Sequence, residues 1–316
     1  MMQSVLKGTN MKKKAIAMVG LAVAAGCAMS MGAASTALAA TSANNIKASN
    51  GAAVYKVNAI KGGSYNLDNK GAKEKISFTY TKSKDVSDAY TGMKMKVDGK
   101  TVTVAKKSYF YEPKVTFIRT ADKTGFISIT ALGENDYTTI SKIYRYKDGA
   151  IESKATVDAL GYFKVFEEYG NHFGAEVSGV KGNDFVFSVA TQFAQCGQTS
   201  FKYQLFEVSE SKQYEPAKEA VKAKASFTKI SSAGQGAKAV TWSPITKNVQ
   251  LYKDANTTKK STTLKKGAQA KIIGVNITPH YVPTLQVQTK SGTKGWIKCT
   301  KKFAKTALFE YATFAG

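Results

Sequence analysis

The chain has 316 residues, and its 46 Lys and Arg residues against 22 Asp and Glu residues give a formal net charge of +24. It contains two histidines and three cysteines, too few for a scaffold built on many disulfides and few for a zinc enzyme, which needs at least three ligands at one site. Tyr and Phe are abundant, proline is scarce, and short runs of Thr, Val and Ile alternate with polar residues. This composition favours β structure.

Residues 1–40 have the pattern of an export leader. Lysines at 12–14 precede an apolar stretch of small residues, which ends in the cleavage signal Ala37-Leu38-Ala39. We predict a signal peptide that begins at Met11 and is removed after Ala39 or Ala40, which leaves no transmembrane segment in the mature chain. A membrane anchor is the alternative, but the stretch is rich in Ala and Gly rather than Leu.

Cys27 offers a different leader. It follows Ala24-Ala25-Gly26, which resembles a lipoprotein cleavage box, so Cys27 would be lipidated. The box prefers Leu, Val or Ile where Ala24 stands, and apolar residues continue past Cys27. We therefore expect a secreted or wall-associated protein rather than a lipoprotein.

The charge is uneven along the remaining chain. Residues 225–316 hold 15 lysines and two acids, whereas residues 41–224 hold 27 basic and 20 acidic residues. A strongly positive region attracts polyanions. For an exported protein these are wall teichoic acid, acidic glycans and anionic lipid, so we expect no nucleic-acid partner.

The region from residue 45 to residue 208 alternates apolar and polar residues in short runs separated by turn signals such as Asp98-Gly99 and Asp148-Gly149. The runs predict strands at residues 53–60, 75–81, 93–97, 101–105, 114–119, 126–132, 138–146, 151–157, 162–167, 174–180, 185–190 and 201–208. We therefore predict an all-β domain, either a β-sandwich or a blade-like propeller fragment.

A faint repeat favours the propeller. The two Asp-Gly turns lie about fifty residues apart, and residues 67–76 have a loose echo at 119–127. Residues 60–208 resemble degenerate FG-GAP/VCBS-type repeats of secreted clostridial proteins. Such repeats often carry a calcium loop. Here Lys70 and Thr124 occupy ligand positions after Asp68 and Asp122, so we expect no metal and interpret both aspartates as turn residues.

The C-terminal region has a different pattern. Short alternating runs at residues 249–252, 270–275 and 285–288 are separated by glycine turns and end in Gly295-Trp296-Ile297. This order, over about residues 245–300, resembles the bacterial SH3-like (SH3b) domain of secreted cell-wall proteins. The resemblance implies a small barrel at residues 240–316 that docks on peptidoglycan or wall teichoic acid.

Two flanking segments complete this organisation. Residues 209–239 lose the alternation, and their charged, Ala-rich and Gly-rich stretches predict a linker with a short helical turn. Residues 308–315 are expected to return as a final strand.

Ligand-binding candidates in the SH3-like region are aromatic and basic: Tyr252, His280, Tyr281, Trp296, Lys298, Lys301 and Lys302. In the resembled family the Gly-Trp pair is a structural element and its Trp often lines the ligand groove, but we favour the interpretation that Trp296 fills the small core. Tyr252 has the same two interpretations. His280 and Tyr281 lie in the excursion at 276–283, where binding loops commonly occur. The three lysines would attract phosphate or carboxylate.

Catalytic constellations are sparse. A cysteine peptidase needs a histidine that holds the thiolate, yet His172 precedes Cys196 and His280 falls in the other region. A glycosidase needs two placed carboxylates, for which Glu167, Glu168 and Glu176 are available.

We therefore predict a non-enzymatic binding protein without a cofactor, held at a Gram-positive-type envelope. An accessory or diverged wall hydrolase and an adhesin for host glycan or protein are the alternatives. Cys196 and Cys299 could pair across the two regions, but we expect them not to, because Cys196 lies in a loop-like stretch and Cys299 follows the last barrel strand.

Overall fold

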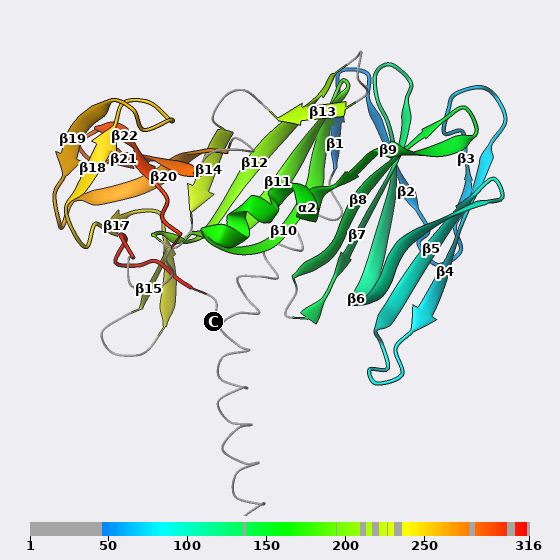
Figure 1. Ribbon diagram of the computed structural model, residues 1–316, viewed down its shortest axis with the longest axis horizontal. Helices are drawn as coiled ribbons and strands as arrows, with labels where there is room; N and C mark the ends of the chain where they lie inside the picture. Colours follow the sequence, from blue (N-terminus) through cyan, green and yellow to red (C-terminus); the bar gives the residue numbers. More distant parts are fainter. Residues whose placement is uncertain are drawn as a thin grey trace, which may run out of the picture. The chain divides into compact units, whose positions relative to one another are not determined.

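The computed structural model describes residues 46–314 except 135–136, 194, 209–212, 217–220, 226, 231–235, 278–281 and 302–306. Strands make up almost all of the regular structure in this part of the chain, which confirms the predicted all-β class (Figure 1). The predicted leader, its cleavage site and Cys27 lie outside the described residues.

The first sheet is an antiparallel meander in the order β3-β4-β5-β6-β7-β8-β9, with β2 beside β6. Its strands are β2 (Ala53–Val57), β3 (Gly63–Tyr65), β4 (Glu74–Lys82), β5 (Tyr90–Val97), β6 (Lys100–Arg119), β7 (Gly125–Leu132), β8 (Thr138–Lys147) and β9 (Ala150–Asp158). Both predicted Asp-Gly turns close hairpins here. Asp98, Gly99, Asp148 and Gly149 all have positive φ, the geometry of the type I′ turn whose twist matches antiparallel strands.

Strand β6 folds this sheet into two layers. Its first half pairs with β5, and its second half pairs with β2 and β7. Between the halves, register shifts and positive φ at Lys107 and Glu112 mark the place where the strand changes partners. One shared core holds Met93, Met95 and Phe110 from one layer and Phe117, Ile127, Ile129 and Tyr144 from the other. The arrangement is sandwich-like, and these strands form one continuous sheet rather than separate four-stranded blades.

Strand β7 is buried on both faces. Ile127 and Ile129 belong to the core just described, whereas Phe126 belongs to a second core and meets Phe185 edge to face, with ring centroids 5.0 Å apart. The layer that contains β7 therefore lies between the β3–β5 layer and the second sheet.

The second sheet runs in the order β1-β10-β11-β12-β14-β20-β21-β22-β18-β19, with β13 beside β12 and β17 beside β20. Its first strands are β1 (Lys47–Ser49), β10 (Gly170–Lys181), β11 (Asp184–Phe193), β12 (Gly197–Val208), β13 (Gln213–Pro216) and β14 (Val221–Ala225). We call the remaining strands the C-terminal sheet: β17 (Ser243–Pro244), β18 (Val249–Tyr252), β19 (Lys260–Leu264), β20 (Gln269–Asn276), β21 (Thr284–Thr289) and β22 (Lys294–Lys298). A separate hairpin joins β15 (Phe227–Ile230) and β16 (Ala237–Val240).

The strand predicted at residues 162–167 is wrong. The segment forms a short helix α2 (Ala159–Tyr162) followed by a 3₁₀ helix η2 (Phe163–Glu168). Asp158 caps α2, because its side chain accepts a hydrogen bond from Gly161 N. Phe163 is fully buried and lies edge-on to Tyr203, with ring centroids 5.3 Å apart, so packing overrides the strand-like alternation.

Residues 209–239, predicted as a linker with a helical turn, contribute strands β13 to β16. Strand β14 pairs with β12 on one side and with β20 on the other, so backbone pairing continues from the central strands into the C-terminal sheet. Strands of four or five residues contain too few positions to show a clear alternation in the sequence, so the pattern did not predict them.

The C-terminal sheet differs from the implied barrel. Among its described strands, no pairing joins β19 back to β17, so the sheet is open. Residues 308–314 form a turn instead of a strand, with one bridge from Phe309 to Ile245. This segment is held by single backbone bonds, such as Gln198 N to Thr313 O at 3.0 Å.

Candidate functional site

The C-terminal sheet has two chemically different faces. One face packs into the core through Leu251, Ile272, Leu285, Val287 and Ile297. Because side chains alternate along a strand, the residues between these point to the opposite face. That outward face holds most of the described candidates.

A row of side chains crosses the outward face. Gln286 pairs with Trp296, Trp296 with Tyr252, and Tyr252 with Lys260. Residues directly opposite on neighbouring antiparallel strands have Cβ atoms about 4.5–5.5 Å apart. Trp296 and Tyr252, which the sequence singled out separately, are therefore neighbours. Trp296 is only 7% exposed and Tyr252 is half-buried, so the indole packs within the row.

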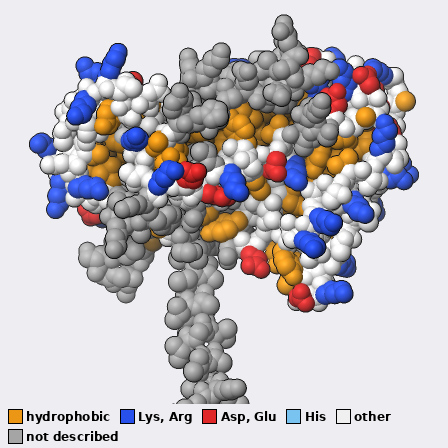
Figure 2. All heavy atoms as spheres, viewed as in Figure 1, with side chains coloured by type: hydrophobic (Ala, Val, Ile, Leu, Met, Phe, Trp, Pro, Cys, Tyr) orange, Lys and Arg blue, Asp and Glu red, His pale blue; other side chains and the backbone are white. Residues whose placement is uncertain are grey.

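Lysines flank this row on the same face. Lys294 and Lys298 stand two residues to either side of Trp296, and both are exposed. Lys271 shares a cross-strand row with Gln288 and Lys294, and its ammonium lies 4.8 Å from the centroid of the Trp242 ring. We call this set the basic aromatic face: Trp242, Tyr252, Lys260, Lys271, Lys294, Trp296 and Lys298. In Figure 2 basic side chains are visible over the C-terminal strands, at the left of the view, as well as over the first sheet at the right.

One acidic residue, Asp254, accompanies the lysines between residues 243 and 301. Its carboxylate accepts backbone hydrogen bonds from Thr258 (3.1 Å) and Lys259 (2.8 Å), which hold its pKa below the ordinary value. This carboxylate is thus committed to the β18–β19 loop. Thr284 Oγ1 donates to Ala255 O at 2.7 Å and ties the same loop to β21. The stretch from residue 243 to residue 301, which holds 11 lysines, therefore keeps a large excess of positive charge.

Close packing against Leu251 explains why a glycine precedes Trp296. A Cβ atom on Gly295 would lie 2.8 Å from Leu251 Cβ, closer than real side chains approach. Gly295 faces the core and admits Leu251, while the next residue, Trp296, faces outward. The glycine therefore sets the spacing between β22 and the core.

Lys301 contacts residues outside the basic aromatic face. Its ammonium is 2.6 Å from a Glu168 carboxylate oxygen and 5.8 Å from the centre of the Tyr169 ring, so it contacts the end of η2. His280, Tyr281 and Lys302 lie outside the described residues. Four members of the basic aromatic face were missed by sequence reasoning: Trp242, Lys260, Lys271 and Lys294. The alternation around Lys271, which lies between the buried Ala270 and Ile272, was a usable signal.

Cys196 and His172 have the properties of core residues. Burial raises the pKa of the Cys196 thiol to about 12, and burial lowers the pKa of His172 to about 4. The thiol contacts Thr199 Oγ1 at 3.5 Å. A thiol with a raised pKa is a poor nucleophile.

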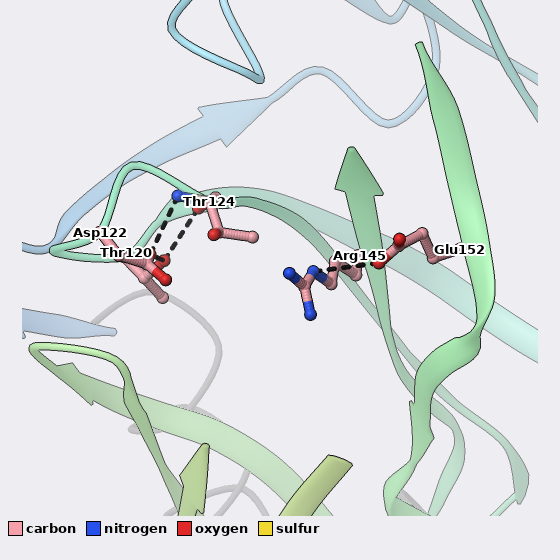
Figure 3. Close-up of polar contacts among 5 residues, drawn as sticks. All are labelled: Thr120, Asp122, Thr124, Arg145 and Glu152. Atoms are coloured by element: carbon pink, nitrogen blue, oxygen red, sulfur yellow. Dashed lines mark hydrogen bonds and ion pairs between the residues drawn. The ribbon is translucent and has the colours of Figure 1, made fainter. Parts of the chain in front are cut away.

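A polar cluster surrounds Asp122 at the turn between β6 and β7 (Figure 3). Burial raises the pKa of Asp122, but hydrogen bonds from Thr120 Oγ1 (2.6 Å) and Thr124 N (3.0 Å), with the charge of Arg145, lower it overall. Arg145 is buried, and its Nε lies 3.1 Å from Glu152 Oε2. The Asp122 carboxylate thus stabilises the turn in which it lies, through its hydrogen bonds with Thr120 and Thr124.

Asp68 behaves in the same way. It accepts a hydrogen bond from Lys70 N at 2.9 Å, and the Lys70 ammonium lies 2.5 Å from Asp148. Across the described ranges, no group of three His, Cys, Asp or Glu side chains is placed to hold a metal ion.

No protein-family model, curated protein or solved structure matches this chain. The resemblances noted above therefore rest on the sequence patterns alone. Within the described part of the chain, no helix has the length and apolar character needed to span a bilayer.

Proposed function

We propose that the basic aromatic face docks this protein onto an anionic polymer of a Gram-positive-type cell envelope, either peptidoglycan or wall teichoic acid. The observation that carries the proposal is the placement of Lys260, Lys294 and Lys298 around the Tyr252–Trp296 pair on one outward sheet face. Lysines supply long-range attraction to phosphate or carboxylate, and a half-buried tyrosine offers a flat contact for sugar or peptide.

The charge pattern supports a polyanion over a neutral ligand. Asp254 is the one acid between residues 243 and 301, which hold 11 lysines, so this stretch keeps a large excess of positive charge. Attraction between exposed charges is screened beyond about 8–10 Å at physiological ionic strength. Binding should therefore weaken as salt rises.

The test is a pull-down of the mature protein with purified Gram-positive walls, before and after chemical removal of teichoic acid. A variant with Lys260, Lys294 and Lys298 changed to Ser should bind untreated walls roughly tenfold more weakly at low salt. A matched control removes three exposed lysines of the first sheet, Lys94, Lys96 and Lys100, and should bind normally. Equal losses in both variants would show that net charge, and not this face, drives binding.

The wall polymer is identified by the treated samples. Loss of binding after teichoic acid removal assigns the ligand to the phosphate polymer, whereas retained binding assigns it to peptidoglycan. Binding to neither sample rejects the anchoring role. Release of soluble wall fragments in the same assay would point to the hydrolase alternative, and selective binding on a host glycan array would point to the adhesin.

A further inference from the structure

Two buried thiols lie where the C-terminal sheet returns to the central strands. Cys196 sits in the turn before β12, and Cys299 directly follows β22. Their side chains are 0% and 2% exposed, and both are free thiols. They belong to the same hydrophobic core although 103 positions separate them in the chain.

Their chain neighbours are in direct contact. The Gln195 side-chain amide donates to Thr300 Oγ1. Gln195 precedes Cys196 and Thr300 follows Cys299, so a hydrogen bond joins the residues next to the two thiols. Thr300 is exposed, whereas both cysteines point into the core. The two short segments thus run beside each other with their cysteines on the inner side.

Backbone bonds fix both segments. Leu308 N donates to Gln195 O at 2.7 Å, and Cys299 N donates to Pro283 O at 3.0 Å. Burial raises the pKa of the Cys299 thiol, and charge on Cys196 would raise it further. These bonds hold the two segments side by side, and both thiols are free.

Against the expectation from the sequence, we propose that Cys196 and Cys299 close an intramolecular disulfide when the folding chain meets a disulfide oxidant. This bond ties the end of the C-terminal sheet to the turn before β12. One thiolate attacks the oxidant's disulfide and releases one thiol. The second thiolate then attacks the resulting mixed disulfide and releases the other. Both cysteine sulfurs are oxidised, the oxidant is reduced to two thiols, and the two cysteine protons end on those thiols.

We expect the disulfide to form while the chain is folding or partly open, and not in the folded protein. Exchange needs a thiolate, and burial holds the pKa of Cys196 near 12, so the closed fold keeps both thiols inert. Once formed, the bond would close a loop of about a hundred residues in the unfolded chain. Loops of that length are those in which a disulfide restricts the unfolded state most. The inference is independent of the ligand of the basic aromatic face.

The experiment refolds the full chain from urea, with Cys27 replaced by Ser, in a buffer of reduced and oxidised glutathione. We expect a mass 2 Da lower than that of the reduced protein and a tryptic peptide pair that joins Cys196 to Cys299. The melting temperature should be higher by about 5 °C or more than that of the reduced protein, and dithiothreitol should reverse the shift. The folded, reduced protein should oxidise much more slowly than the refolding chain.

Cys196→Ser and Cys299→Ser are the controls, and neither should show the mass change or the shift. Recovery of two free thiols after refolding, or of disulfide-linked dimers only, would overturn the proposal. A bridged protein that melts at a lower temperature would overturn it as well, because the junction would then not be built for the bond. Faster oxidation of the folded than of the refolding protein would contradict the role of burial.

Discussion

Strands β7 and β22 show how differently the two regions of this molecule use the same secondary structure. In β7 both faces are buried, with Phe126 in one core and Ile127 in the other. In β22 Gly295 and Ile297 pack into the core, while the opposite face carries the buried ring of Trp296 between two exposed lysines, Lys294 and Lys298.

We therefore expect the β7 layer to determine stability and the outward face of the C-terminal sheet to determine binding. A strand buried on both faces contributes apolar area to two cores but presents no side chain to a partner. The outward face of β22 presents its two lysines to solvent, where their charge can meet a ligand. Substitutions in the β7 layer should therefore change folding, and outward substitutions in the C-terminal sheet should change binding.

Phe126→Ala should have the largest effect on stability. The ring is fully buried and lies edge-on to Phe185, so its removal leaves a cavity between two layers. We expect a loss of about 3–5 kcal/mol in the free energy of unfolding, measured by urea denaturation. Tyr109→Ala, at a ring that is 42% exposed, is the control and should cost far less. If Phe126→Ala loses no more stability than Tyr109→Ala, the second buried face of β7 does not contribute as argued.

His172 gives the β10 region a pH dependence. Burial lowers its pKa to about 4 in the folded protein, below the ordinary value of 6.5. As pH falls from about 6.5 toward 4, the imidazole is protonated in the unfolded chain but stays neutral in the folded one. The free energy of unfolding therefore falls by at most about 3 kcal/mol. Urea denaturation across this range should show a shallower decline in His172→Gln. Identical slopes in the two proteins would show that His172 is protonated freely in the fold.

Gly295→Ala tests the covered face of β22. The added Cβ would meet Leu251 Cβ at 2.8 Å, and overpacking of this kind typically costs about 1–3 kcal/mol. Lys294→Ala, at the exposed neighbouring position, should leave the thermal midpoint almost unchanged. If Gly295→Ala melts like the unmodified protein, Leu251 can move aside and the spacing argument fails.

Glu168→Gln should have the smallest effect. It breaks the ion pair with Lys301, but both side chains are more than half exposed, and such pairs contribute little. We expect no resolvable change in the urea midpoint and no change in wall binding. A clear loss of wall binding would instead show that Lys301 belongs to the docking surface, although its ammonium contacts Glu168 and Tyr169.

The sequence by itself determined most of the local structure. Period-2 alternation located most strands of the first sheet, although it missed β3 and divided β6 into two. The Asp98-Gly99 and Asp148-Gly149 pairs indicated two hairpins, because Gly and Asp tolerate positive φ. It also indicated Tyr252, Trp296 and Lys298 as binding candidates and showed that the C-terminal region is basic.

Only the tertiary structure decided which strands meet and which faces are covered. Alternation reports local conformation, but the partner of a strand depends on contacts between residues far apart in the chain. The pairing of β14 with β20 and the burial of Phe163, which turns a strand-like segment into η2, arise in this way. The same long-range register brings Trp296 opposite Tyr252 and places the lysines of three strands on one face.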